Sequence, residues 1–243
     1  MAVSSWAQSP DAPPADAAAV VATLDQHWTT RDEGASVAAI NAAIRDGLKA
    51  FPDDYAILWR AARFRWWQAD GETNEKTKRM VAKEGWNYAK RAVDAKPTGA
   101  EAKYYVALSI GAYSQAVGIL KALTDGLEGQ FVENLEFALK NNEAFDRCGG
   151  RRAKGRYYWE LPWPKRDLKK SKEELAKAVA ASPEHLRNYY YLAQTLIKDG
   201  DAKGAKEQID KVLNGASDFD PPEARRVKAW AQPVAEEIQR ELK

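Results

Sequence analysis

The residue types that most often carry catalysis or bind metals are scarce and scattered in this sequence. Among its 243 residues are two histidines, His27 and His185, and one cysteine, Cys148. A single cysteine excludes an intrachain disulfide and any zinc or iron–sulfur site built from several thiolates. The short motifs typical of metalloproteases, serine hydrolases and nucleotide-binding proteins are absent as well. We therefore expect no enzymatic activity, no metal and no cofactor.

The remaining candidates for chemistry have simpler structural interpretations. His27 is best interpreted as a packing residue, and His185 as an exposed residue at a helix start. Arginines near Cys148 would lower the pKa of its thiol, although a plain thiol in a turn is the favoured interpretation. The Gly149-Gly150 pair precedes a helix and could hold an anion on free backbone N–H groups, but such pairs are also ordinary helix connectors.

The charge distribution argues against nucleic acid as a partner. Lys and Arg number 37 against 35 Asp and Glu, so the net charge is only +2. The densest basic run, residues 165–172, is followed at once by Glu173 and Glu174, and its lysines can pair along a helix. No run of about 18 apolar residues is present, so we expect no transmembrane segment.

Almost all of the chain after residue 16 has the pattern of helices. Residues 1–16 are rich in Ser, Pro, Ala and Asp; we interpret them as a disordered tail, with Ser5-Trp6-Ala7 as the possible remnant of a removed leader. Residues 17–243 then form a single domain. Low cysteine usage fits either the bacterial cell envelope or the cytoplasm.

Recurring helix breaks indicate an internal repeat. In residues 186–217, Tyr189, Leu192 and Ala193 lie on one helix face, Gly200 makes the turn, and Ala205 begins the returning face. This spacing is similar to the tetratricopeptide repeat. We predict an all-α, tetratricopeptide-like helical-repeat solenoid of about five degenerate units, with inserted long helices and a C-terminal capping helix; an irregular helical bundle is the alternative.

The first helices of the predicted units should face an inner groove. Trp, Tyr and Arg dominate recognition surfaces, but Trp and Tyr also fill cores well. We take the set as the candidate ligand- and partner-binding residues, forming aromatic walls and a mildly basic rim: Arg60, Phe64, Trp67, Lys103, Ile110, Tyr113, Arg152, Arg156, Trp159, Arg187, Tyr190 and Gln194.

Residues 50–215 resemble the TatT family, the tetratricopeptide-like partner of bacterial TRAP transporters. The resemblance lies in the order of short motifs: Tyr104-Tyr105, a glycine-containing helix, Phe145-Asp146 with Gly149-Gly150, and Leu161-Pro162-Trp163-Pro164 before a basic amphipathic helix. The regulators of microtubule dynamics, a related helical-repeat family, are a weaker match. The TatT resemblance implies a periplasmic or lipid-anchored binding module, a homotrimer and no catalytic residues.

These observations lead to two functional hypotheses. The first is a non-enzymatic envelope protein that docks a solute-binding or other protein partner and holds a small organic-acid or apolar ligand in the aromatic groove. The second is a peptide-docking adaptor that organises a protein complex without a small ligand. The apolar helix expected over residues 107–123, with Gly111 and Gly118, is either the central buried helix or a surface for self-association.

Overall fold

The computed structural model describes residues 16–243, and every regular element in that range is a helix, which confirms the predicted all-α repeat fold. Of the expected tail, residues 1–15 lie outside the described part; Asp16 caps the first helix by accepting a hydrogen bond from the backbone N of Ala19 at 2.7 Å. The helices are α1 (Ala17–Trp28), α2 (Gly34–Ala50), α3 (Tyr55–Gly71), α4 (Glu75–Ala95), α5 (Ala100–Val117), α6 (Ile119–Thr124), α7 (Leu127–Asn141), α8 (Phe145–Glu160), α9 (Leu168–Ala181), α10 (Leu186–Lys198), α11 (Ala202–Asn214) and α12 (Pro221–Glu241).

Short polar residues cap half of these helices. The side chain of each accepts a hydrogen bond from the backbone N–H of the residue three positions later, which has no partner within the helix. The residues that do this at later helices are Asp54, Asn74, Asp167, Asp201 and Asp220.

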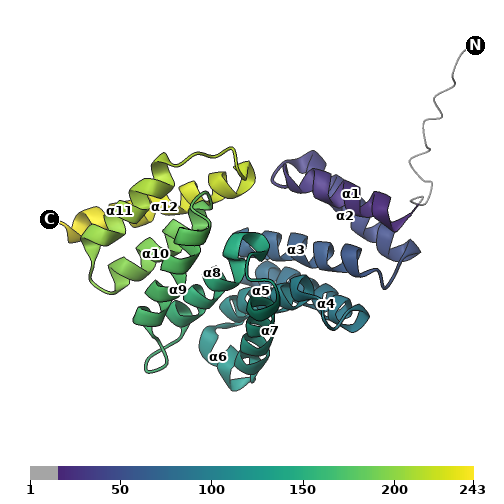
Figure 1. Cartoon of the computed structure of the whole chain (residues 1–243), viewed down its shortest axis with the longest axis horizontal. Helices are drawn as coiled ribbons and strands as arrows, with labels where there is room; N and C mark the ends of the chain where they lie inside the picture. Colours follow the sequence, from purple (N-terminus) through teal and green to yellow (C-terminus); the bar gives the residue numbers. More distant parts are fainter. Residues whose placement is uncertain (1–15) are drawn as a thin grey trace, which may run out of the picture.

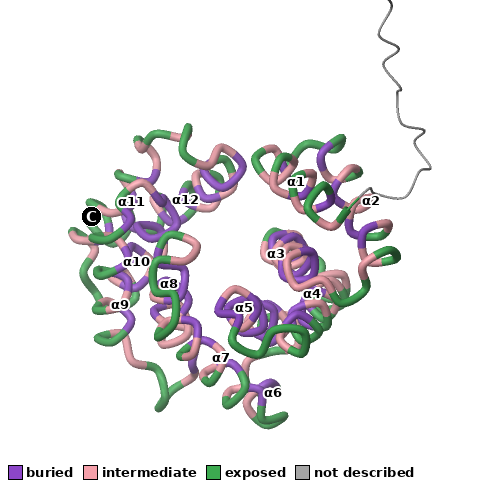
Figure 2. Tube along the Cα trace, turned by 45° about the vertical axis from the view of Figure 1, so that its right-hand side comes forward, coloured by how far each residue is buried: buried purple, intermediate pink, exposed green. Residues whose placement is uncertain are grey.

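The helices form five antiparallel pairs followed by the single helix α12. The pairs are α1–α2, α3–α4, α5–α7, α8–α9 and α10–α11, with α6 inserted in the third. The first helices of successive pairs also contact one another, and α10 contacts α12. The chain curves so that α12 returns beside the α1–α2 end of the arch (Figure 1 and Figure 2). The elements that begin and end the described chain therefore meet.

The helix expected over residues 107–123 is broken, which corrects that prediction. Gly118 adopts φ +92°, and the chain turns there from α5 into α6. Only glycine takes this conformation readily, so Gly118 ends α5. A second positive-φ glycine, Gly126 (φ +75°), ends the turn before α7. The helix α5 itself is central, with Tyr104, Tyr105 and Ile110 among its buried residues.

The start of α8 is a left-handed turn. Asp146, Arg147 and Cys148 have φ of 51°, 53° and 59°, a conformation that costs L-residues about 1–2 kcal/mol each. The helix resumes at Gly149, where an added Cβ would collide with the hydroxyl of Tyr104. Glycine is therefore needed for the close approach of Tyr104.

No helix in residues 16–243 combines the length and apolar character needed to cross a bilayer.

Candidate functional site

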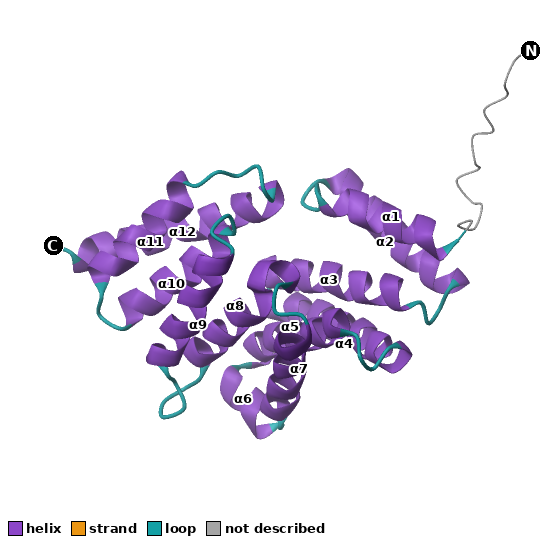
Figure 3. Ribbon diagram, viewed as in Figure 1, coloured by secondary structure: helices purple, strands orange, loops and turns teal. Residues whose placement is uncertain are grey.

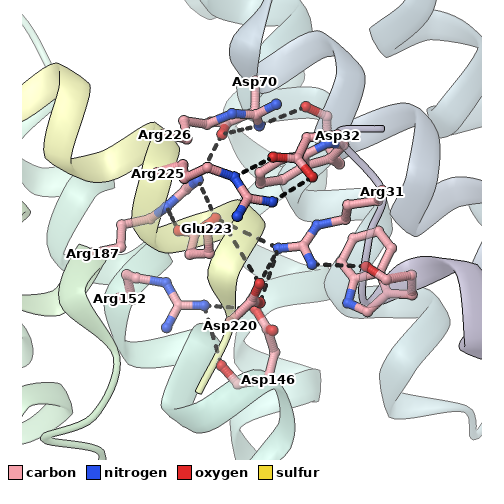
Figure 4. A network of polar contacts seen from close by, with 12 residues as sticks. Arg31, Asp32, Asp70, Asp146, Arg152, Arg187, Asp220, Glu223, Arg225 and Arg226 are labelled. Atoms are coloured by element: carbon pink, nitrogen blue, oxygen red, sulfur yellow. Dashed lines mark hydrogen bonds and ion pairs between the residues drawn. The ribbon is translucent and has the colours of Figure 1, made fainter. Parts of the chain in front are cut away.

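A cluster of buried and half-buried arginines and carboxylates joins the two ends of the arch (Figure 4). Its members are Arg31 from the α1–α2 turn, Asp70 from α3, Arg187 from α10, and Asp220, Glu223 and Arg226 at α12; we call them the arginine network. Arg31 lies 2.9 Å from the carboxylate of Asp220, and Arg187 lies 2.8 Å from Asp70. Arg187 also donates two hydrogen bonds to Glu223. Four distant segments are thus held by charge-assisted hydrogen bonds.

The pKa values of the network reflect its burial and its pairing. Burial raises the pKa of Glu223, but the charge of Arg187, with its hydrogen bond, outweighs burial and leaves that pKa below its usual range. Burial lowers the pKa of Arg187, but Asp70 and Glu223 hold it well above its usual value. Burial lowers the pKa of Arg226 to about 10, with Asp70 opposing the change and Arg187 adding to it. Glu223, Arg187 and Arg226 are therefore ionised at neutral pH.

The Trp67 ring contacts two arginines of this network. The guanidinium of Arg226 lies 3.1 Å from the Trp67 ring centroid, and that of Arg31 lies 4.1 Å from it. Arg226 also donates a hydrogen bond to the backbone oxygen of Trp67 at 2.8 Å. Cation–π contacts of buried arginines are stabilising, so Trp67 is a structural anchor between α3 and α12.

The left-handed turn at α8 is attached to the same region. Arg152 is buried and donates to the carboxylate of Asp146 at 2.6 Å, to the backbone oxygen of Asp146 at 3.1 Å, and to Asn188 at 3.2 Å. His185, expected to be exposed, is only 6% exposed and packs against Phe219. Burial, reinforced by the charge of Arg152, holds the pKa of His185 well below its usual value, so this histidine is neutral at neutral pH.

A partly open pocket lies beside the network, between α5, α6, α7 and α8; we call it the central pocket. Most of its wall is apolar, as is usual for a small-molecule site. Gly111 leaves its wall open on α5, because an added Cβ would meet only Phe131 within 4 Å, at 3.6 Å. The apolar lining includes Leu108, Ile110, Gly111, Ile119, Ala122, Leu123, Leu127, Phe131, Ala153 and Leu161.

Alongside three carboxylates, Asp70, Glu128 and Glu160, the polar part of the lining of the central pocket carries three arginines, Arg152, Arg156 and Arg187. Each is already paired: Arg156 lies 2.7 Å from Glu160 and donates to Gln194 at 2.8 Å. A ligand in the central pocket would contact guanidinium groups that their partners hold in place, together with the hydrogen-bond acceptors of those partners. Within residues 16–243 no cluster of three His, Cys, Asp or Glu residues is placed to bind a metal ion.

The predicted binding residues do not share one surface. Four of them, Ile110, Arg152, Arg156 and Arg187, line the central pocket. Trp159 and Gln194 form a neighbouring half-buried cluster with Arg156, in which the Trp159 indole N–H donates to the backbone oxygen of Gln194 at 3.2 Å. These six residues come together.

The other six predicted residues lie in the core or in contacts between neighbouring helices. Phe64 and Trp67 belong to the core formed by α1, α2 and α3, and Tyr190 packs against Trp230 of α12. Arg60 pairs with Asp25 at 2.7 Å. Lys103 lies over Phe137, and Tyr113 packs against Trp86. A role for any of the twelve in binding stays a prediction.

Of the arginine network, only Arg187 was predicted from the sequence; its partners Arg31, Arg226, Asp70, Asp220 and Glu223 were not. Arg31 and Asp220 are 189 residues apart, and no local pattern relates residues at such a separation. One available signal was Asp220 before Pro221-Pro222, which is a typical helix start. The residue type of a helix cap does not, however, indicate whether its side chain also pairs with a distant arginine.

Comparison with known proteins now adds to this geometry. A tetratricopeptide-repeat model matches residues 165–231. A crystal structure of a thermophilic tetratricopeptide protein from Thermus thermophilus superposes with a TM-score of 0.62, at 17% identity, over 87% of this chain and 98% of that one. No curated protein matches the sequence. These findings define a tetratricopeptide-type helical-repeat protein, a class typical of protein-interaction scaffolds, generally without catalytic activity.

Within that class, the family model described as regulator of microtubule dynamics protein 1–3 matches residues 20–148, more than half of the chain. The chain belongs to this family. The sequence resembled it less than it resembled the TatT family, and no comparison shows the latter.

Proposed function

We propose that this protein is a non-enzymatic binding protein that holds a small molecule in the central pocket while other faces of the solenoid dock a protein partner. The pocket is the observation that supports this most strongly, because it combines an apolar wall with arginines and carboxylates in its polar lining. Such a site fits an amphipathic ligand with an apolar body and a carboxylate or other polar head.

Gly111 allows the central pocket to be blocked without disturbing a polar contact. In the variant Gly111→Leu, the side chain extends into the pocket past Phe131. We expect the affinity for a fluorescent fatty-acid analogue to fall about tenfold or more, because the ligand loses the space it would occupy. Gly129→Leu is the matched control, since an added Cβ at this exposed position on α7 meets nothing. Equal binding by both variants would reject the pocket as the site.

Native mass spectrometry of the purified protein tests the same proposal without a chosen probe. A small molecule released only on denaturation, and absent from Gly111→Leu, supports ligand binding. The same spectra report the oligomeric state, for which the TatT resemblance suggests a trimer.

The alternative is a peptide-docking adaptor without a small ligand. The observation that favours it is the half-buried cluster of Arg156, Trp159 and Gln194, because the Trp159 ring lies between Arg156 and Lys198, each 3.9 Å from its centroid. Loss of captured proteins from Trp159→Ala, together with a ligand-free mass spectrum, would favour this function.

The cellular setting rests on resemblance alone. A periplasmic or envelope location and a TRAP-type solute-binding partner follow from the TatT motifs, with the cytoplasm as the alternative. The matched family is named for regulation of microtubule dynamics, so co-sedimentation with microtubules belongs beside a pull-down from envelope extract as a test of the partner.

A further inference from the structure

Two of the largest exposed hydrophobic side chains lie at one edge of the arch. Trp163 is 86% exposed in the loop between α8 and α9, and Leu120 is 68% exposed on α6. Figure 3 shows this loop and α6 at the lower edge, and both remain there in the rotated view of Figure 2. An ion pair between Lys165 of the loop and Glu128 joins the loop to α7, the helix that follows α6. We call this surface the Trp163 edge.

The Trp163 edge is also basic. Residues 161–172 contain five Lys or Arg and a single acidic residue, Asp167. Within residues 16–243, Arg166 and Lys169 have no carboxylate at ion-pair distance. Arg166 instead donates to the backbone oxygen of Leu161 at 3.0 Å, which holds the loop in place and leaves its charge uncompensated. Exposed apolar groups are thus surrounded by cationic ones.

From this combination we infer that the Trp163 edge docks onto the surface of an anionic lipid bilayer. Tryptophan is enriched at the membrane–water interface, where its ring and its N–H are both accommodated. Lysines and arginines near such a surface are attracted to anionic headgroups. Trp163 and Leu120 enter the interface, while Arg166 and Lys169 contact phosphate or carboxylate headgroups. The protein binds peripherally, and this inference does not depend on the proposed ligand pocket.

Co-sedimentation with lipid vesicles tests the inference. We expect the full chain to bind phosphatidylcholine vesicles containing phosphatidylserine, to bind pure phosphatidylcholine much less, and to lose affinity as salt is raised. Trp163→Ser should lower the affinity about tenfold, since an interfacial anchor is lost. Arg166→Gln and Lys169→Gln should each lower it about fivefold.

Met80→Ser is the control, because Met80 is 66% exposed on α4, away from this edge. It should bind vesicles like the original protein, and circular dichroism should show all variants folded. No binding of the original protein to anionic vesicles, or an equal loss in Met80→Ser and Trp163→Ser, would overturn the inference. So would a Trp163→Ser variant that retains vesicle binding but loses a protein partner.

Discussion

At the residue scale, the least replaceable group is a single carboxylate. Glu223 is 6% exposed and accepts hydrogen bonds from Arg187, while Arg31 lies 3.9 Å away. Removing one member of a buried ion pair leaves the other charge desolvated and uncompensated, which costs far more than the pair contributes on balance.

We predict that Glu223→Gln lowers the free energy of unfolding by about 3–5 kcal/mol. The amide keeps the shape of the side chain but removes its charge. Denaturant unfolding provides the measurement. Glu136→Gln is the matched control, because Glu136 pairs with Lys154 at 2.7 Å but is 51% exposed; its expected change is within about 0.5 kcal/mol. A similar cost for the two variants would contradict this account.

The acid stability of the protein should also depend on Glu223. Because its folded-state pKa is lowered, the stabilisation is complete above the unfolded-state pKa of about 4.3. It is lost as the pH falls from there through the still lower folded-state pKa. Unfolding free energies measured between pH 5 and pH 3 should therefore fall less steeply in Glu223→Gln than in the original protein.

His185 predicts a separate dependence at higher pH. Its folded-state pKa is depressed by burial and by Arg152, so below the unfolded-state value of about 6.5 the unfolded chain binds a proton that the folded protein does not. Stability should thus decline from about pH 6.5 downward, with a slope of up to about 1.4 kcal/mol per pH unit. His185→Gln should remove that slope, and an unchanged slope would assign it to other groups.

At the element scale, the beginning of α8 stores backbone strain. Three consecutive non-glycine residues take left-handed conformations, and Arg152 holds two of their polar groups. Strained turns of this kind persist only where surrounding contacts impose them.

Glycine should be accepted in this turn although it weakens ordinary helices. Arg147 has φ 53° and an exposed side chain, so we predict that Arg147→Gly changes the unfolding free energy by less than about 0.5 kcal/mol or raises it. Lys90→Gly, at an exposed position inside α4, should cost about 1 kcal/mol. Equal losses in both variants would show that the turn is not strained.

Helix positions were predictable from the sequence because local chemistry determines them. Breaks such as Phe51-Pro52 and Gly200-Asp201 fall between helices as the sequence indicates. The break at Gly118 was missed because a glycine within an apolar, helix-like run is often tolerated. The left-handed turn was missed because Asp146, Arg147 and Cys148 are not residues whose types predict positive φ in a row.

At the scale of the whole molecule, the arch is closed by side chains. Arg225 donates to Asp32 at 2.7 Å and 2.8 Å, and Arg31 reaches Asp220. The backbones of α1 and α3 are not packed directly on α12 in the way that neighbouring pairs are packed. Closure therefore depends on long arginine side chains crossing the space between the two ends.

Removing one of these side chains should open the arch. We predict that Arg31→Met increases the radius of gyration measured by small-angle X-ray scattering and lowers the unfolding free energy by about 3 kcal/mol, because Asp220 loses its buried partner. Arg45→Met, at an exposed position on α2, should leave the scattering unchanged. An unchanged radius in Arg31→Met would mean that the remaining contacts of α12 suffice for closure.

This closure explains why the candidate groove was only partly predictable. The helical register predicts that Arg187 and Trp67 face the inside of the solenoid. Whether such residues face solvent depends on how far the array curves, which is the sum of small rotations at every pair. Here the array curves until Trp67 and Arg187 meet α12, so their indole and guanidinium groups contact protein, whereas the α5–α8 region keeps the central pocket.

Closure of the array also fixes its number of helix pairs. An open solenoid can gain or lose a helix pair at either end or in its middle, since each pair contacts only its neighbours. Here one additional pair would carry Glu223 and Arg226 past Arg31 and Trp67, and one pair fewer would leave them short. A change in chain length that preserves this closure must therefore be an insertion within a helix pair, as α6 is between two glycines. We therefore expect relatives that keep the arginine network to have the same number of helix pairs and to differ in the length of such insertions.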